Sequence, residues 1–138
     1  IADTGCNHHS GNPRTPGVIR REIKFGPKVQ IHNGATMQAT HETNLPIPSL
    51  SSTATHTHIY PENKSGTLVS IGQICNDGCW AIFDKNKVWI IKKDTGKIIL
   101  NGNRNPQDKL WYFDLNKKQD QTKKLKIPIM SSDVNFEL

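Results

Sequence analysis

The chain has 138 residues, the length of one domain with room for a second small unit at most. Hydrophobic residues make up 34% of it, which suffices for a modest core and is too many for a fully disordered chain. No run of apolar residues approaches the roughly 20 that a membrane-spanning helix needs. Composition therefore favours a small globular protein.

The formal net charge of +6 is unevenly distributed along the chain. Residues 1–83 hold 6 basic and 5 acidic side chains, whereas residues 84–138 hold 12 basic and 7 acidic ones. Much of the excess lies in the lysine-rich stretch 117–126, which lacks interleaved aromatic residues and arginines. We interpret this stretch as a solvated linker with only a weak attraction for nucleic acid.

The first half of the chain shows mainly β patterns. Residues 29–31 and 36–40 flank His32-Asn33-Gly34, and an Asn-Gly pair between extended segments predicts a hairpin. The threonine-rich segment 53–60 alternates in the manner of a strand. One short helix is expected over residues 68–75, with Gly78 as its C-terminal stop.

The sequence pattern in the second half of the chain predicts four more strands. Three short apolar segments, at residues 80–83, 87–91 and 97–100, are followed by an aromatic segment at 110–115. From residue 116 onward the sequence is polar and rich in lysine. The expected fold class is therefore mainly β.

The tripeptide Asp-Thr-Gly occurs twice, and its two settings differ. Asp94-Thr95-Gly96 lies between lysines and isoleucine-rich strands, where Asp and Gly simply form a hairpin turn. Asp3-Thr4-Gly5 follows the apolar pair Ile1-Ala2 and precedes the small Cys6. An aspartic protease needs this setting, in which a strand delivers the Asp into a tight loop and Gly lets two backbones approach closely.

The order of the features after Asp3 resembles a known family, the retropepsin-like aspartic protease in the Gag-Pol polyprotein of copia-type LTR retrotransposons. Residues 3–9 are similar to its Asp-Ser/Thr-Gly-Ala/Cys-x-x-His motif, and residues 27–36 to its flap hairpin. Residues 59–61 resemble its Tyr-x-Pro strand end, and residues 67–75 its Asn-Leu-Leu-Ser-Val-x-Gln-Leu-Cys segment. With further matches downstream, the resemblance spans roughly residues 1–115.

This resemblance implies a fold and a set of site residues. The fold would be a pepsin-like or retropepsin-like closed β-barrel half with one short helix, plus a C-terminal β-hairpin extension. The residues are the catalytic Asp3 with its positioning neighbours Thr4 and Gly5, a substrate-binding flap, and an apolar layer behind the catalytic loop. The flap would comprise Ile31, His32, Asn33, Gly34 and Ala35, and the layer Leu68, Val69 and Ser70.

The resemblance also implies an activity and partners. One catalytic Asp per chain implies a homodimer that hydrolyses peptide bonds of its own polyprotein by means of a water molecule, with no metal or other cofactor. The expected location is the cytoplasm, within a virus-like particle.

The domain organisation follows from the same resemblance. Residues 1–83 would form most of the protease domain, 84–115 a strand-rich extension, and 116–138 a linker toward the next polyprotein segment. The family has further strands before the catalytic Asp, so a chain starting at Ile1 is expected to be cut from a longer product.

The cysteines and histidines offer a different hypothesis. Three cysteines cannot complete a disulfide framework, which favours a reducing environment. Cys6-x-x-His9 together with Cys75-x-x-x-Cys79 could form a Cys₃His zinc set, although the two pairs are separated by far more than compact finger spacing. Alternatively, Cys75 and Cys79 are small buried hydrophobic residues.

Three further alternatives remain open from the sequence. His56-x-His58 would place two imidazoles on one face of a strand, where they could bind a metal. A decayed or domesticated element could retain a β-rich domain that only binds partners. The basic C-terminal part could support nucleic-acid binding without catalysis.

Overall fold

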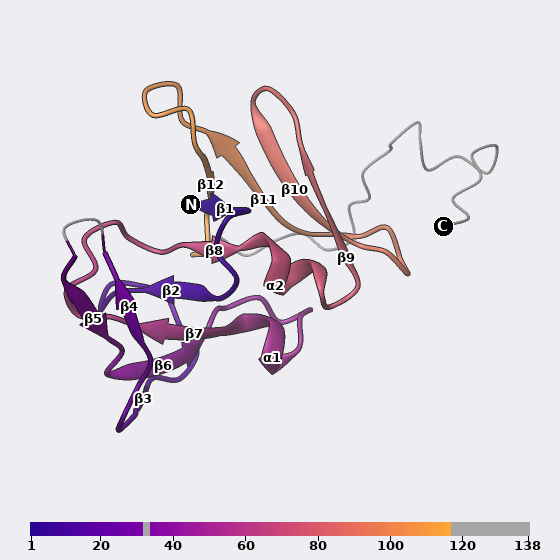
Figure 1. The fold of residues 1–138 in the computed structure, drawn as a ribbon. Helices are drawn as coiled ribbons and strands as arrows, with labels where there is room; N and C mark the ends of the chain where they lie inside the picture. The colour runs from indigo at the N-terminus through magenta and orange to yellow at the C-terminus, as the bar shows by residue number, and fades with distance from the viewer. Residues whose placement is uncertain (32–33, 117–138) are drawn as a thin grey trace.

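The computed structural model describes residues 1–31 and 34–116 (Figure 1). These residues form twelve strands and two short helices, so the expectation of a mainly β protein is confirmed. The strands fall into two four-stranded sheets and two pairs. The sheets are open, and no closed barrel is found in the part of the chain that is described.

The first four-stranded sheet has the order β2-β7-β6-β3. Its strands are β2 (His9–Gly11), β7 (His56–Ile59), β6 (His41–Asn44) and β3 (Arg21–Glu22). Strands β2 and β7 are parallel, whereas β6 is antiparallel to both of its neighbours. In β7 the side chains of Thr57 and Ile59 are buried, while those of His56 and His58 lie on the other, partly exposed face, as strand geometry requires.

The predicted hairpin is present and consists of β4 (Lys28–Gln30) and β5 (Thr36–Gln38). At its tip Gly34 has φ +82°, a backbone conformation that glycine adopts without strain. Met37 on β5 is buried and packs in a small apolar cluster with Ala39, Tyr60 and Ile23. The hairpin therefore has an apolar base of its own.

The second four-stranded sheet is antiparallel, with the order β12-β11-β10-β9. Its strands are β9 (Cys79–Phe83), β10 (Lys87–Lys92), β11 (Ile98–Arg104) and β12 (Trp111–Phe113). Strand β9 ends at Phe83, the position where the sequence suggested a domain boundary, and it pairs along its length with β10. The second Asp-Thr-Gly forms the β10–β11 turn as predicted, with Gly96 at φ +71° and its N–H donated to the Lys92 carbonyl.

The helical content differs from the single helix expected. The segment 53–60 was predicted as a strand, but its first residues belong to helix α1 (Ser52–Thr55). The strand, β7, begins only at His56. The hydroxyl of Ser51 accepts from the Ala54 N–H and caps this turn, a local signal that the threonine-rich pattern hid. The one helix expected, over residues 68–75, is present as α2 (Ile71–Cys75) and is followed by Gly78 at φ +72°, but it is shorter because Val69–Ser70 form a strand.

One apolar cluster joins the two halves of the chain. It includes Leu45 and Leu50 before β7, Ile74 on α2, and Ile90 and Leu100 in the second sheet, all buried. No helix in residues 1–31 and 34–116 is long and apolar enough to cross a membrane. The predicted lysine-rich linker lies almost entirely at residues 117–138, outside the described residues.

Candidate functional site

The first Asp-Thr-Gly lies at the end of a short parallel strand pair. Strand β1 (Ala2–Asp3) runs beside β8 (Val69–Ser70), with Ala2 opposite Val69 and Asp3 opposite Ser70 (Figure 1). Val69 and Ser70 are buried, Ala2 packs on the main apolar cluster, and Asp3 is only partly buried. A partly accessible carboxylate thus lies at the end of a strand whose partners, Val69 and Ser70, are buried and come from the middle of the chain.

Hydrogen bonds hold the loop after Asp3 in place. The Gly5 N–H donates to Asp3 Oδ1 at 2.7 Å, and a Cβ added to Gly5 would lie 3.3 Å from the same oxygen. The Ser70 hydroxyl donates to the Cys6 carbonyl at 2.8 Å, which ties the loop to β8. Thr4 is exposed at the top of the loop. The predicted residues Asp3, Thr4 and Gly5 therefore share one tight turn, and of the predicted apolar layer Val69 and Ser70 lie directly behind it.

A buried histidine links this loop to the rest of the fold. His9 Nδ1 accepts from the Ser70 N–H at 2.8 Å, and His9 Nε2 donates to the Ala54 carbonyl at 2.6 Å. These two partners fix the tautomer of a neutral imidazole, because one ring nitrogen must accept and the other must donate. Burial lowers the pKa of His9 to about 4, since a charged imidazole would lose its hydration there.

Gln73 on α2 is another buried polar residue of this region. Its Oε1 accepts from the His9 N–H at 2.7 Å, and its Nε2 donates to the carbonyls of Thr53 and His56, both at 2.9 Å. The side chain thus connects α2, β2 and the α1–β7 segment. Neither His9 nor Gln73 was expected to organise the site; the only sequence signal was a polar residue inside the apolar stripe 68–75 and a histidine within the motif.

Because His9 is neutral in the folded chain, we expect the folding stability to fall in weak acid. The pKa of His9 is about 4 in the folded chain against an ordinary 6.5, so between these values the unfolded chain binds more protons. The free energy of unfolding should fall by up to about 3 kcal/mol as the pH drops from 6.5 to 4. His8, whose pKa is also lowered to about 4 by burial and by the nearby His58 and His56, acts in the same direction.

Urea unfolding at several pH values between 7.5 and 4 measures this dependence. His9→Gln should make it shallower, because one of the titrating groups is gone, while the contribution of His8 remains. His41→Gln, in which a partly buried histidine of the same sheet is replaced, should keep the wild-type slope. An unchanged slope in His9→Gln would show that other groups cause the acid sensitivity.

The predicted flap corresponds to the tip of the β4–β5 hairpin. Ile31 donates its N–H to the Ala35 carbonyl and accepts from the Gly34 N–H, which closes the turn. Ile31, Gly34 and Ala35 are exposed, and the predicted flap residues His32 and Asn33 lie outside the described residues. In Figure 1 the hairpin stands at the end of the β2–β7 sheet away from α1. Its apolar base is separate from the cluster beneath Asp3.

The zinc set proposed from Cys6, His9, Cys75 and Cys79 does not form among the described residues. His9 uses both ring nitrogens in hydrogen bonds, and no group of possible metal ligands found in residues 1–31 and 34–116 contains a cysteine. Burial raises the pKa of the Cys79 thiol to about 11, as expected for a buried hydrophobic cysteine.

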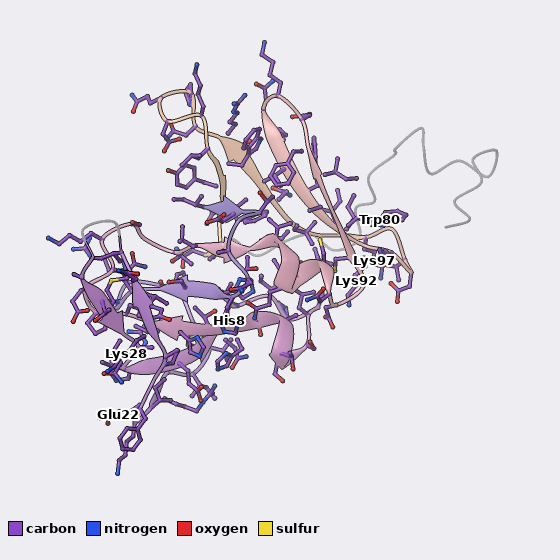
Figure 2. All side chains as sticks on the ribbon, viewed as in Figure 1. His8, Glu22, Lys28, Trp80, Lys92 and Lys97 are labelled. Carbon is purple, nitrogen blue, oxygen red and sulfur yellow. The ribbon has the colours of Figure 1, made fainter. Side chains whose placement is uncertain are left out.

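A different group of potential metal ligands does come together. In residues 1–31 and 34–116, His8, His56 and His58 each offer one ring nitrogen, and these atoms lie within 4.8 Å of one another. The His8 and His58 rings stack with centroids 4.4 Å apart, and His8 Nε2 lies 2.9 Å from His56 Nδ1. Figure 2 shows His8 beside β7. The face expected for His56-x-His58 is therefore present, together with a third imidazole that the sequence did not indicate.

Comparisons with known proteins add no relative. No protein-family model matches the sequence, and neither a characterised protein nor a solved structure is significantly similar to it. Inferences about function thus depend on the geometry of the sites and on the motifs of the sequence.

Proposed function

We propose that the chain is the main part of a retropepsin-like aspartic endopeptidase that processes the Gag-Pol polyprotein of a copia-type retrotransposon. The observation that carries the proposal is the setting of Asp3. Its carboxylate is partly accessible, accepts the Gly5 N–H at 2.7 Å, and stands beside the buried strand β8. An ordinary surface turn, such as the one that holds Asp94, has no buried strand running parallel to it.

The chemistry needs two such carboxylates, so the active form is a homodimer with one Asp3 from each copy. Two carboxylates a few ångströms apart cannot both ionise at low cost, and they would share one proton. The ionised carboxylate takes a proton from a water molecule, whose oxygen attacks the peptide carbonyl carbon. The protonated carboxyl group donates its proton to the developing oxyanion. Collapse of the tetrahedral intermediate breaks the C–N bond, and the leaving amine receives a proton from the dyad.

The other predicted elements fit the same reaction. An extended peptide could pair with the backbone of the β4–β5 hairpin in the manner of an added strand. Closure of this hairpin over a substrate would pivot at its apolar base, where Met37 and Ala39 pack against Tyr60 in a cluster separate from the core under Asp3. The Ser70 hydroxyl and His9 hold the catalytic loop from behind.

Peptide cleavage tests the proposal. Purified chain would be incubated with overlapping peptides from the polyprotein that encodes it, at pH 5 to 7, and the products identified by mass spectrometry. We expect cleavage at defined bonds, and inhibition by a statine-type compound that mimics the tetrahedral intermediate. A folded dimer that cleaves none of these peptides would instead support a β-rich binding module without catalysis.

A further inference from the structure

A row of polar side chains crosses the outer face of the β2-β7-β6-β3 sheet. The parallel register of β2 and β7 pairs His9 with Thr57, both completely buried. The preceding residues, His8 and His56, therefore lie opposite each other on the other face, where His58 joins them two residues along β7. Three imidazoles are thus brought together by strand pairing, from parts of the chain 48 residues apart.

The neighbouring strand β6 supplies a carboxylate that orients one of these imidazoles. Glu42 is opposite His58 in the β6–β7 register, and its Oε2 accepts from His56 Nε2 at 2.8 Å. Arg21 on β3 holds the other carboxylate oxygen through a 3.1 Å contact to Oε1. Both oxygens of Glu42 thus face nitrogen donors, and an ionised carboxylate acts only as an acceptor.

This arrangement settles which atoms face one another. Because the Glu42 carboxylate only accepts, His56 carries a proton on Nε2, and Nδ1 of the neutral ring offers its lone pair as an acceptor. That lone pair points at His8 Nε2, 2.9 Å away. Ligands of a tetrahedral zinc ion lie roughly 3.3 Å apart, given bonds of about 2.0–2.1 Å. A divalent metal could therefore replace the proton between these two nitrogens after a small rotation of the rings.

We infer that His8, His56 and His58 form a binding site for a late first-row divalent metal, with Zn²⁺ as the ion that the donor set fits best. Three imidazoles with one open position is an established zinc donor set, and imidazole is a preferred ligand of such metals. Glu42 holds His56 from behind, as carboxylates commonly do for metal-binding histidines. A surface cleft of about 310 Å³ lies beside two of these histidines and is lined in part by His8, His56 and Ser52.

The bound metal would join the start of β2 to β7. Since His8 follows the Asp3 loop directly, the metal would fix the end of that loop to the sheet. The metal site consists of residues that take no part in the peptide hydrolysis proposed above. Either proposal can therefore fail without the other.

Zinc binding to the purified chain tests the inference. After incubation with ZnSO₄ and dialysis, we expect one Zn²⁺ per chain, and a rise in melting temperature with zinc concentration, because a ligand of the folded state stabilises it. His8→Gln and His58→Gln should each abolish the stoichiometric zinc and the rise. Glu42→Gln should weaken zinc binding about 10- to 100-fold. His41→Gln is the matched control, since this residue lies on the same sheet beside Glu42 but outside the cluster, and it should bind zinc as the wild type does.

Cobalt distinguishes the imidazole site from a cysteine site. The Co²⁺-loaded wild type should show visible bands of a nitrogen- and oxygen-coordinated ion without a sulfur-to-cobalt charge-transfer band. Circular dichroism of each metal-free variant verifies that it is folded. Stoichiometric zinc in a folded His8→Gln/His58→Gln double variant, a sulfur charge-transfer band, or a folded wild type without zinc after dialysis would each overturn the inference.

Discussion

Replacing Asp3 with asparagine is expected to abolish peptide cleavage while leaving the fold intact. Asparagine keeps the oxygen that accepts the Gly5 N–H, but it can neither remove a proton from water nor donate one to the substrate. Loss of a general acid–base group costs about 10²- to 10⁴-fold in rate, and here both copies of the group are lost. The initial rate of cleavage of a defined peptide, together with a circular dichroism spectrum, measures both effects.

The second Asp-Thr-Gly provides the matched control. Asp94→Asn makes the same chemical change in the same tripeptide, but in the exposed turn between β10 and β11. This variant should cleave at the wild-type rate. Equal loss in both variants would mean that the two tripeptides are equivalent, and cleavage by folded Asp3→Asn would assign the activity to another group or to a contaminant.

Replacing Gln73 with leucine, a residue of similar volume, is expected to cause a large loss of folding stability. Leucine fills a similar space, but it leaves the His9 N–H and the carbonyls of Thr53 and His56 without their partner. An unsatisfied buried group costs about 1–3 kcal/mol, and because the His9 N–H is buried while the two carbonyls are part-buried, a total of about 3 kcal/mol is expected. This is a large part of the 5–15 kcal/mol typical of a whole domain. The shift of the urea midpoint measures it.

Gln38 on β5 serves as the control for that change. Its exposed side chain makes one hydrogen bond, to the Gly26 carbonyl. Gln38→Leu should alter the free energy of unfolding by no more than about 0.5 kcal/mol. If Gln73→Leu were equally mild, water or a rearranged backbone would have to satisfy the three groups, and α2 would not be the link between the loop and the sheet.

Local signals explain which elements could be predicted from the sequence. The Asn-Gly hairpin, the turn at Gly96 and the end of α2 near Gly78 all depend on neighbouring residues and on glycine at positive φ, and all were confirmed. The first half of segment 53–60 was predicted wrongly, because threonine favours strands while the cap at Ser51 favours a helical turn.

Long-range pairing could not be deduced in the same way. The parallel registers of β1 with β8 and of β2 with β7 place His9 beside Ser70 and His8 beside His56. No local pattern encodes such partners, since parallel strands are joined by long connections and their register depends on packing. Consequently Asp3 and the pair His56 and His58 could be proposed from local patterns, whereas the buried network behind Asp3 and the addition of His8 to the pair became visible only in the folded chain.

Mixing active and inactive chains tests most directly whether one Asp3 from each of two copies forms the catalytic centre. The wild-type chain would be held at a fixed concentration and equilibrated with increasing amounts of Asp3→Asn, and the rate of peptide cleavage followed. We predict that the rate falls toward zero as mixed dimers replace wild-type dimers, and that Asp94→Asn added instead causes no fall. A rate that stays constant under excess Asp3→Asn would contradict a shared catalytic centre.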